Sequence, residues 1–304
     1  MERAYRVRRS CLSVPASSDR FITSARGAGV DEVFLDLEDS VAAGAKAQAR
    51  AAAVSALTSG EWAASTVGVR INDVSTPWAV EDVLAVVCPR LDEIVLPKVR
   101  SVRDVIWLDV LLGQVEALRG LPHGAVGIEA QIEDAAGLAC VEAIASCSSR
   151  LEALVFGPAD FMASVGMRSL EVGEQPSGYA GGDAYHYPLM RILVAARSAG
   201  LQAVDGPYLR VRDTDGFRRS AGSAAALGYD GKWVLHPSQV QVANEVFAPT
   251  PAEVARASAI LAAYAQATDV ELRGAVMLGD EMIDEASRKM ALAVVARAQA
   301  AGLA

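Results

Sequence analysis

Cysteine pairs and long apolar runs are missing from this sequence. The 304 residues include four cysteines, Cys11, Cys88, Cys140 and Cys147, and no two of them share Cys-x-x-Cys spacing. A zinc ribbon or a disulfide scaffold is therefore not indicated, and buried thiols in a reducing cytoplasm are expected. The basic N-terminus, MERAYRVRRS, is not followed by the apolar stretch of a signal peptide, and no run has the length of a membrane span. We expect a cytoplasmic protein with no membrane partner.

Positive charge and several well-known site signatures are also lacking. The net charge is −9 and the isoelectric point is near 5.0, which argues against nucleic acid as a partner. An anionic small molecule is not excluded, because it needs only a local cationic pocket. The sequence contains no phosphate loop, zinc-binding helix, Ser-His-Asp order or heptad run. Its chemistry must therefore depend on residues that the fold brings together.

What the sequence does contain is a regular alternation of two kinds of segment. Short β-branched runs alternate with Ala-rich stretches whose apolar spacing suits helices packed on a sheet. The expected strands are residues 11–15, 32–37, 66–71, 92–97, 125–132, 151–156, 201–204 and 232–236. Eight such units predict an α/β fold, a (β/α)₈ TIM barrel. A doubly wound open sheet is the alternative, but no Gly-x-Gly-x-x-Gly follows the first strand.

The last part of the chain is not needed to close eight strand–helix units. We expect residues 1–247 to form the barrel and residues 248–304 a C-terminal helical segment. One helix is expected to begin at Thr250-Pro251 and another to span about 285–300. The intervening residues, with Gly274 and Gly279, suit a mobile flap. This segment could act as a lid, an oligomerisation arm, or both.

Polar residues close most of the expected strands. They are Asp36, Glu38, Asp39, Arg70, Asn72, Lys98, Glu133, Asp160, Asp205 and His236. The steps from residue 36 to 70, 98, 133 and 160 are 34, 28, 35 and 27 residues, each about one strand–helix unit. Because the carboxyl ends of barrel strands converge on one mouth, these side chains predict an active site there.

Glu133 and Asp160 form the sharpest pair of candidates. They follow adjacent expected strands, so their carboxylates could meet and hold a hard cation such as Mg²⁺, completed by water and substrate oxygens. The alternative is that each residue caps the helix that follows it. Spacing alone leaves both interpretations open.

Arg70 and His236 are weaker candidates. Arg70 is the lone charge on its strand and could bind a carboxylate or stabilise an enolate oxygen, or form an internal salt bridge with Asp36, Glu38 or Asp39. His236 could be a base, but a histidine before proline at a strand end is more often a packing or hydrogen-bonding residue.

Several motifs occur in the order found in one known family. They are RRSCLSVPAS, VFLDLEDSVAAGAKAQAR, VRINDVSTPW, IVLPKV, QIEDAAGL, VFGPADFMASVGM, GKWVLHPSQV and GDEMIDEAS. The sequence resembles the citrate-lyase-β-like (HpcH/HpaI aldolase/citrate lyase) family from about Arg9 to Ala291, and within it the malyl-CoA and β-methylmalyl-CoA lyases.

The resemblance implies a barrel with a C-terminal lid and a homo-oligomer, a trimer or hexamer. It implies Mg²⁺, with Mn²⁺ as an alternative, at Glu133 and Asp160, and catalytic roles for Arg70 and Asp284, the latter reaching a neighbour's site. On sequence alone, capping of the last helix would be the simpler role for Asp284. The implied substrate and CoA contacts are Ser13, Ser18, Arg20, Arg70, Ala159, Asp160, Leu235 and His236.

The chain departs from the family pattern in two places. Ser18 and Ser24 stand where relatives often carry an arginine and a lysine for the CoA phosphates, and Arg20 and Arg26 are candidates to replace them. The motif around Glu133 is IEDAAG where many relatives have IETARG.

The expected activity is reversible cleavage of a 3-hydroxyacyl-CoA into an acyl-CoA and a 2-oxo acid. Malyl-CoA or β-methylmalyl-CoA giving glyoxylate is the first choice, and citramalyl-CoA giving pyruvate follows. The alternatives are a malyl-CoA thioesterase with the same site, a citrate-lyase-β-type subunit, or a non-enzymatic binding protein.

Overall fold

Eight parallel strands close into a barrel in the computed structural model, which describes residues 5–270 and 272–303. The strands are β1 (Ser10–Pro15), β2 (Glu32–Asp36), β3 (Thr66–Arg70), β4 (Glu93–Leu96), β5 (Gly127–Ile132), β6 (Leu151–Phe156), β7 (Gln202–Asp205) and β8 (Gly231–Val234). Each strand pairs with the next, and β1 also pairs with β8. The predicted (β/α)₈ barrel is confirmed, and the open doubly wound sheet is excluded because its edge strands would not pair.

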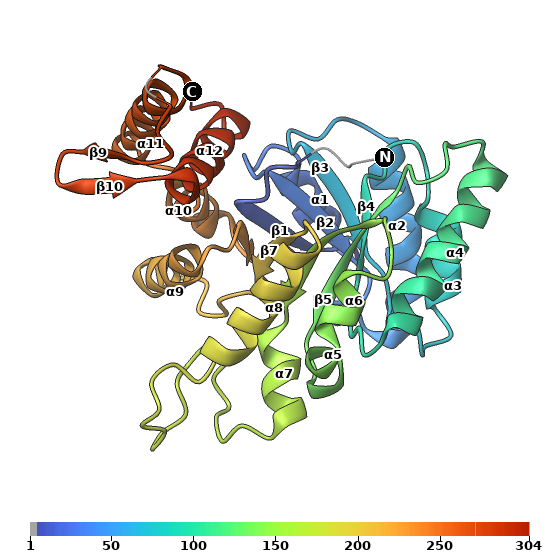
Figure 1. Cartoon of the computed structure of the whole chain (residues 1–304). Coiled ribbons are helices and arrows are strands. Elements are labelled where there is room, and N and C mark those ends of the chain that lie inside the picture. Colours follow the sequence, from blue (N-terminus) through green and yellow to red (C-terminus); the bar gives the residue numbers. More distant parts are fainter. Residues whose placement is uncertain (1–4, 271, 304) are drawn as a thin grey trace. The chain divides into compact units, whose positions relative to one another are not determined.

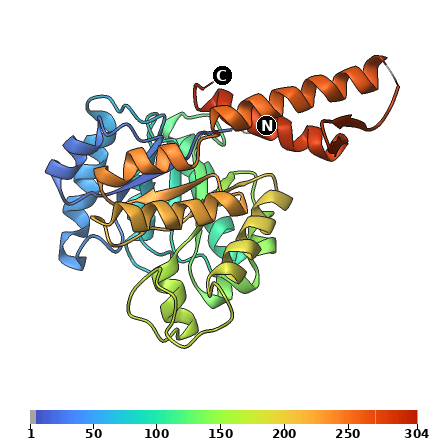
Figure 2. The same ribbon diagram turned by 90° about the vertical axis from the view of Figure 1, so that its left-hand side faces the viewer.

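Helices surround this barrel, as the two views in Figures 1 and 2 show. They are α1 (Asp19–Ala25), α2 (Lys46–Thr58), α3 (Ala79–Val86), α4 (Val102–Arg119), α5 (Ala135–Ala139), α6 (Val141–Ala145), α7 (Pro158–Val165), α8 (His186–Ser198), α9 (Thr214–Leu227) and α10 (Pro237–Val246), with a 3-10 turn at Ala43–Ala45. Local sequence sets their ends. A capping box of Ser101 and Asp104 begins α4, and Gly120, in the left-handed region with φ of 68°, ends it.

Side chains that point into the barrel form layers. On β2 and β5, inward residues alternate with outward ones, so Glu32, Phe34 and Asp36 share one face of β2. A middle layer is apolar and includes Phe34 and Trp233, whose ring centroids are 4.5 Å apart. The inward-facing charged residues, such as Glu32 and Asp36 of β2, are thereby divided between a floor below this layer and a mouth above it.

The floor is a cluster of buried charges around Arg8, which precedes β1. The Arg8 guanidinium forms ion pairs with Glu32 (3.2 Å), Glu93 (2.5 Å), Glu129 (2.7 Å) and Glu152 (2.8 Å), and the side chains of all five residues are at most 4% exposed. Arg6 also pairs with Glu152 at 3.0 Å, so Arg8 is the cation that Glu32, Glu93 and Glu129 share in the barrel interior.

Burial, together with the neighbouring carboxylates, raises the pKa values of Glu32, Glu93 and Glu129. Burial, Glu93 and Glu152 raise the pKa of Glu129 to about 8, although Arg8 opposes the shift. Oxygens of Glu32, Glu93 and Glu129 lie within 4.8 Å of one another, as in a metal site. Arg8 occupies the charge centre of this cluster, so shared protons explain it without an ion.

Residues 248–304 form a second compact unit. It contains α11 (Pro251–Ala265), a π-helical turn (Gln266–Val270), the hairpin of β9 (Val276–Leu278) and β10 (Glu281–Ile283), and α12 (Glu285–Ala300). Thr250 caps α11 with Glu253 in a capping box, at the predicted position. The hairpin was not predicted, because each strand has three residues, too few for a periodic pattern; Gly279, with φ of 66°, turns the chain between them. None of the helices in the described ranges is long and apolar enough to cross a bilayer.

Candidate active site at the barrel mouth

The carboxyl ends of strands β2 to β5 bring a set of charged side chains to the mouth. Asp36 ends β2, Arg70 ends β3, and Lys98 and Glu133 follow β4 and β5. Asp36, Arg70 and Glu133 are buried, with Asp160 partly exposed. The convergence expected from their spacing is therefore present, and the middle layer separates these groups from the floor.

Arg70 is held rigidly by two carboxylates and an indole. Its Nε and Nη2 donate to Asp36 at 2.7 and 2.8 Å, and its Nη1 lies 3.2 Å from Glu38. The Trp233 ring lies beneath the guanidinium, 5.4 Å from Cζ. Burial opposes the charge, but Asp36, Glu38 and Glu133 outweigh it and raise the pKa of Arg70. The predicted salt bridges with Asp36 and Glu38 are present. They fix the guanidinium at the mouth.

Glu133 is a buried carboxyl with two local donors. Its Oε1 accepts from the backbone N–H of Lys98 at 2.7 Å, and its Oε2 accepts from Gln131 Nε2 at 2.6 Å. A side chain at Gly157 would collide with Glu133, so glycine keeps this space open. Burial, followed by the charge of Asp160, raises the pKa of Glu133 to about 8. Without a further cation, Glu133 and Asp160 oppose each other's ionisation.

Neither Glu133 nor Asp160 caps a helix, so that interpretation is wrong for both. Helix α7 begins at Pro158 with Gly157 as its N-cap, which places Asp160 in the first turn instead. Helix α5 is capped by Asp134, whose side chain accepts from the N–H of Gly137 at 2.7 Å. The two carboxyls are oxygen donors close enough to raise the pKa of Glu133, a donor set that fits a hard divalent cation.

Lys98 links the carboxylates that follow β2 to Glu133, which follows β5, and the sequence did not reveal this link. Its Nζ forms an ion pair with Glu38 and another, at 3.1 Å, with Asp39, while its backbone N–H holds Glu133. Lys98 has a φ of 50°, a left-handed conformation that is costly for a residue with a Cβ. The Pro-Lys pair at a strand end was the available signal, but sequence alone does not show a positive φ.

The residues expected to contact CoA are distributed along β1 and α1. Ser13 is partly buried on β1, and Ser18 caps α1 by accepting from the N–H of Phe21 at 3.4 Å. Arg20 is exposed. Arg26 is bound elsewhere: it stacks on Trp62 at 4.6 Å and donates to the carbonyls of residues 56, 59 and 61. Arg26 is therefore a poor replacement for a phosphate-binding lysine, which leaves Arg20.

The remaining expected contacts lie after β6 and β8. Ala159 is exposed in the first turn of α7, and the N–H of Leu235 donates to Gln239 Oε1 at 2.8 Å. His236 caps α10, because its Nδ1 accepts from the N–H of Ser238 at 3.1 Å. This favours the hydrogen-bonding interpretation of His236 over a role as base.

Asp284 belongs to the second unit. Its side chain caps α12 by accepting from the N–H groups of Ala286 at 2.9 Å and Ser287 at 3.2 Å. Asp284 is therefore the N-cap of α12, the simpler of its two expected roles. The cap uses Oδ1, and Oδ2 has no hydrogen bond within the described residues.

Comparisons with known proteins agree with this arrangement. The HpcH/HpaI aldolase/citrate lyase family model matches residues 9–237. The L-malyl-CoA/beta-methylmalyl-CoA lyase of Cereibacter sphaeroides is 39% identical over 305 residues, covering 97% of this chain and 95% of that protein. The citrate lyase subunit beta of Escherichia coli is 32% identical over 302 residues, covering 99% and 97%. A crystal structure of CitE from Mycobacterium tuberculosis in complex with magnesium, acetoacetate and coenzyme A matches with a TM-score of 0.76 at 28% identity, covering 98% of this chain and 100% of that one.

These matches extend over most of the chain and not only over the motifs. The chain belongs to the HpcH/HpaI aldolase/citrate lyase family, and it is an enzyme, a lyase of the aldolase type. The family resemblance noted in the sequence is confirmed.

Proposed function

We propose that this enzyme reversibly cleaves a 3-hydroxyacyl-CoA into an acyl-CoA and a 2-oxo acid. Malyl-CoA or β-methylmalyl-CoA, giving glyoxylate, is the proposed substrate class, followed by citramalyl-CoA giving pyruvate. The observation that carries the proposal is the pair Glu133 and Asp160 beside the fixed guanidinium of Arg70. The identity of 39% to a malyl-CoA/β-methylmalyl-CoA lyase over nearly the whole chain supports it.

Glu133 and Asp160 would hold a divalent cation, Mg²⁺ by preference and Mn²⁺ as an alternative. The raised pKa of Glu133 supports this role, since a bound cation would offset the charge repulsion that now opposes its ionisation. The M. tuberculosis relative with magnesium in its structure points the same way. When bound, the ion supplies Lewis-acid polarisation of the 2-oxo acid's carbonyl and carboxylate oxygens.

Arg70 would stabilise charge on the reacting groups. In the cleavage direction the 3-hydroxyl loses its proton, the bond between C2 and C3 breaks, and the electron pair passes to the acyl-CoA as an enolate. The Arg70 guanidinium, preorganised by Asp36 and Glu38, would offer positive charge to that enolate. Proton return to the acyl α-carbon then completes the acyl-CoA.

We assign the CoA and substrate contacts to Ser13, Ser18, Arg20, Arg70, Ala159, Asp160, Leu235 and His236. Arg20 is the proposed phosphate contact, because it is exposed while Arg26 is engaged with Trp62. His236 would contribute position rather than proton transfer, since its Nδ1 is used in the cap of α10.

Asp284 is the proposed proton donor and acceptor at the acyl α-carbon, supplied by a neighbouring subunit of a homotrimer or hexamer. Residues 248–304 would serve as the lid that excludes water from the enolate. A mixing experiment tests this: Asp284→Ala and Glu133→Ala, each inactive, are combined under verified subunit exchange. Partial return of activity supports assembly between subunits, whereas no return places the site within one chain.

Product analysis tests the reaction itself. The enzyme and Mg²⁺ are incubated with acetyl-CoA or propionyl-CoA and with glyoxylate or pyruvate, and the products are identified by mass. Formation of a 3-hydroxyacyl-CoA supports the proposal. Release of malate and free CoA from malyl-CoA would instead identify a thioesterase, and activity only with added partner subunits would identify a citrate-lyase-β-type subunit.

A further inference from the structure

A cavity lies outside the barrel, where strands β7 and β8 meet helices α8 and α9 and the loop that precedes α8. Its volume is about 280 Å³. Val204 and Trp233 belong to the inner cluster, so their strand neighbours Asp205 and Lys232 point outward, into the layer that contains the cavity. Neither residue faces the mouth that holds Arg70 and Glu133.

One wall of this cavity carries positive charge with unused donor capacity. Lys232 is buried, and Asp205 is the one partner of its Nζ within residues 5–270 and 272–303, so two of its three N–H donors are unspent. Arg219, an exposed residue of α9, lines the same cavity; its charge acts on Asp213, but its guanidinium has no hydrogen bond or ion pair in the described chain. The hydroxyls of Ser220 and Ser223 lie beside it on α9.

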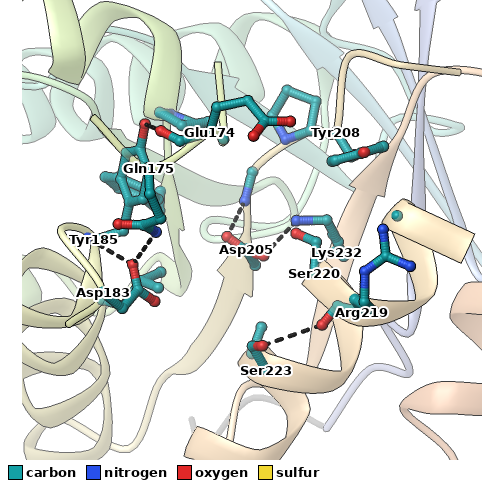
Figure 3. A pocket seen from close by; sticks show the side chains of 18 residues that line it. Glu174, Gln175, Asp183, Tyr185, Asp205, Tyr208, Arg219, Ser220, Ser223 and Lys232 are labelled. Atoms are coloured by element: carbon teal, nitrogen blue, oxygen red, sulfur yellow. Dashed lines mark hydrogen bonds and ion pairs between the residues drawn. The ribbon is translucent and has the colours of Figure 1, made fainter. Parts of the chain in front are cut away.

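The opposite wall carries an unbalanced carboxylate. Asp183 accepts from Gln175 Nε2 at 2.6 Å and from the N–H of Tyr185 at 2.9 Å, but no cation pairs with it in the described ranges. Its neighbour Glu174 is neutralised by Arg210 at 2.9 Å. Figure 3 shows Asp183 and Gln175 on one side of Asp205, and Lys232 and Arg219 on the other.

The size and lining of the cavity limit what it can hold. A volume near 280 Å³ is small for a ligand site, so the occupant must be small. Phe156, Leu189 and Ala224 supply an apolar surface between the charged walls. Lys232 pairs with Asp205 and Arg210 with Glu174, so Arg219 and Asp183 are the lining residues whose charges have no ion-pair partner in the described chain. One unpaired charge of each sign suits a zwitterion better than a polyanion such as a nucleotide or the phosphates of CoA.

We propose that this cavity binds a zwitterionic α-amino acid with a small aliphatic side chain. Its carboxylate would pair with Arg219 and take the unspent donors of Lys232, and its ammonium group would pair with Asp183. The aliphatic side chain would cover Phe156 and Leu189. This site is separate from the proposed lyase chemistry, and no step of that chemistry depends on it.

Isothermal titration calorimetry of the full chain, without acyl-CoA, tests the proposal. L-Valine and L-leucine are the probes, and N-acetyl-L-valine and L-valinamide each lack one of the two charges. We expect saturable binding of L-valine and L-leucine, with each single-charge derivative at least about tenfold weaker, as loss of a hydrogen bond to a charged group predicts. Equal binding of N-acetyl-L-valine, or no heat from either amino acid at millimolar concentration, would overturn the proposal.

Two variants locate the binding. Arg219→Met and Asp183→Asn should each weaken L-valine binding about tenfold or more. Arg218→Met is the matched control: Arg218 is the preceding residue of α9, it pairs with Glu245 at 2.6 Å, and it does not line the cavity. Equal loss in Arg218→Met and Arg219→Met would mean that α9 was disturbed in general and would contradict the assigned contacts. Because the readout is heat of binding and not turnover, failure here leaves the proposed lyase function standing.

Discussion

The floor and the mouth of the barrel each surround a buried arginine with carboxylates, yet they balance their charge differently. At the floor, Arg8 faces four glutamates whose side chains are at most 4% exposed, and burial together with the neighbouring carboxylates raises the pKa of Glu129 to about 8. At the mouth, Arg70 and Lys98 form ion pairs with Asp36, Glu38 and Asp39, so two cations serve three carboxylates. The surplus there is Glu133 with Asp160, and Asp160 is partly exposed.

The comparison shows that an acidic cluster alone does not define a metal site. The floor glutamates meet a geometric criterion for a metal, but their oxygens converge on a guanidinium and solvent does not reach them. At the mouth, the two carboxyls outside the ion-pair network are the buried Glu133 and the partly exposed Asp160, so Asp160 opens the pair to solvent. Two features therefore separate a binding site from a proton-sharing core: solvent access, and carboxyls that form no ion pair within the described residues.

The largest difference between floor and mouth is expected for Glu129, on β5, and Glu133, which directly follows that strand. Glu133→Gln should abolish Mg²⁺ binding and reduce turnover on the order of 10³-fold, because a neutral amide is a weak ligand. Glu129→Gln, four residues earlier and facing the floor, is the matched control and should leave both unchanged. Calorimetric Mg²⁺ titration and steady-state kinetics measure the effects. Full activity of Glu133→Gln after exhaustive chelation would disprove the metal assignment.

Removal of the floor cation should be the largest effect on stability. Arg8→Met leaves the buried carboxyls of Glu32, Glu93 and Glu129 without their ion-pair partner, while Glu152 keeps its ion pair with Arg6 at 3.0 Å, and we expect a loss of about 3–5 kcal/mol in the free energy of unfolding. Urea denaturation measures it. Should Arg8→Met not fold, adding Glu129→Gln and Glu152→Gln should restore folding. A change below about 1 kcal/mol would mean that protonation alone balances the floor.

At the mouth, the geometry of the cation should matter more than its charge. Arg70→Lys keeps the charge but cannot donate to both oxygens of Asp36 while reaching Glu38. We expect turnover to fall about 10²-fold, with a smaller stability change than Arg8→Met causes. Near-normal kcat in this variant would show that Arg70 is structural only.

The floor should also give a pH dependence of stability. Glu129 has a pKa near 8 in the folded chain against 4.5 as the ordinary value, so the folded state binds more protons between these pH values. The free energy of unfolding should therefore fall as pH rises from about 5 to 8. Glu129→Gln should raise stability by on the order of 2 kcal/mol at pH 8 and leave it nearly unchanged at pH 5. A parallel shift at both pH values would contradict this.

The smallest expected effect on turnover comes from a variant that removes the side chain of Lys98 but keeps its backbone N–H. Lys98→Gly accommodates the φ of 50° and keeps the N–H that holds Glu133, but removes the ammonium beside Glu38 and Asp39. We expect kcat to fall about tenfold with no loss of Mg²⁺ affinity. Lys98→Arg, which keeps the charge, should retain most of the activity. Weakened Mg²⁺ binding in Lys98→Gly would instead assign the ammonium a role in the metal site.

The barrel and its mouth could be predicted because both depend on order along the chain. Alternating segments indicate parallel strands, and the carboxyl end of each strand is then known, which placed Arg70 and Glu133 together. The start of α7 was harder to predict than the strand ends. The helix begins at Pro158, so Asp160 lies in its first turn and does not cap it.

Ion pairs across the barrel could not be predicted from the sequence, for a different reason. Arg8 lies outside every expected strand, and its partners come from β2, β4, β5 and β6. Periodicity shows that Glu129 points inward, but not which cation it meets. The cavity beside Asp205 and Lys232 was missed likewise, because it depends on how α8 and α9 pack against the strands.

The place of Arg8 also has a consequence for how the chain folds. Its backbone reaches Gly231 so closely that any side chain at residue 231 would collide with it, and the adjacent Arg9 carbonyl accepts from the N–H of Lys232 at 3.2 Å. The guanidinium is therefore carried to the floor by the same step that pairs β1 with β8. Until the first and last strands meet, the glutamates of the central strands must stay hydrated or protonated, so closing the ring and neutralising its interior are one cooperative event.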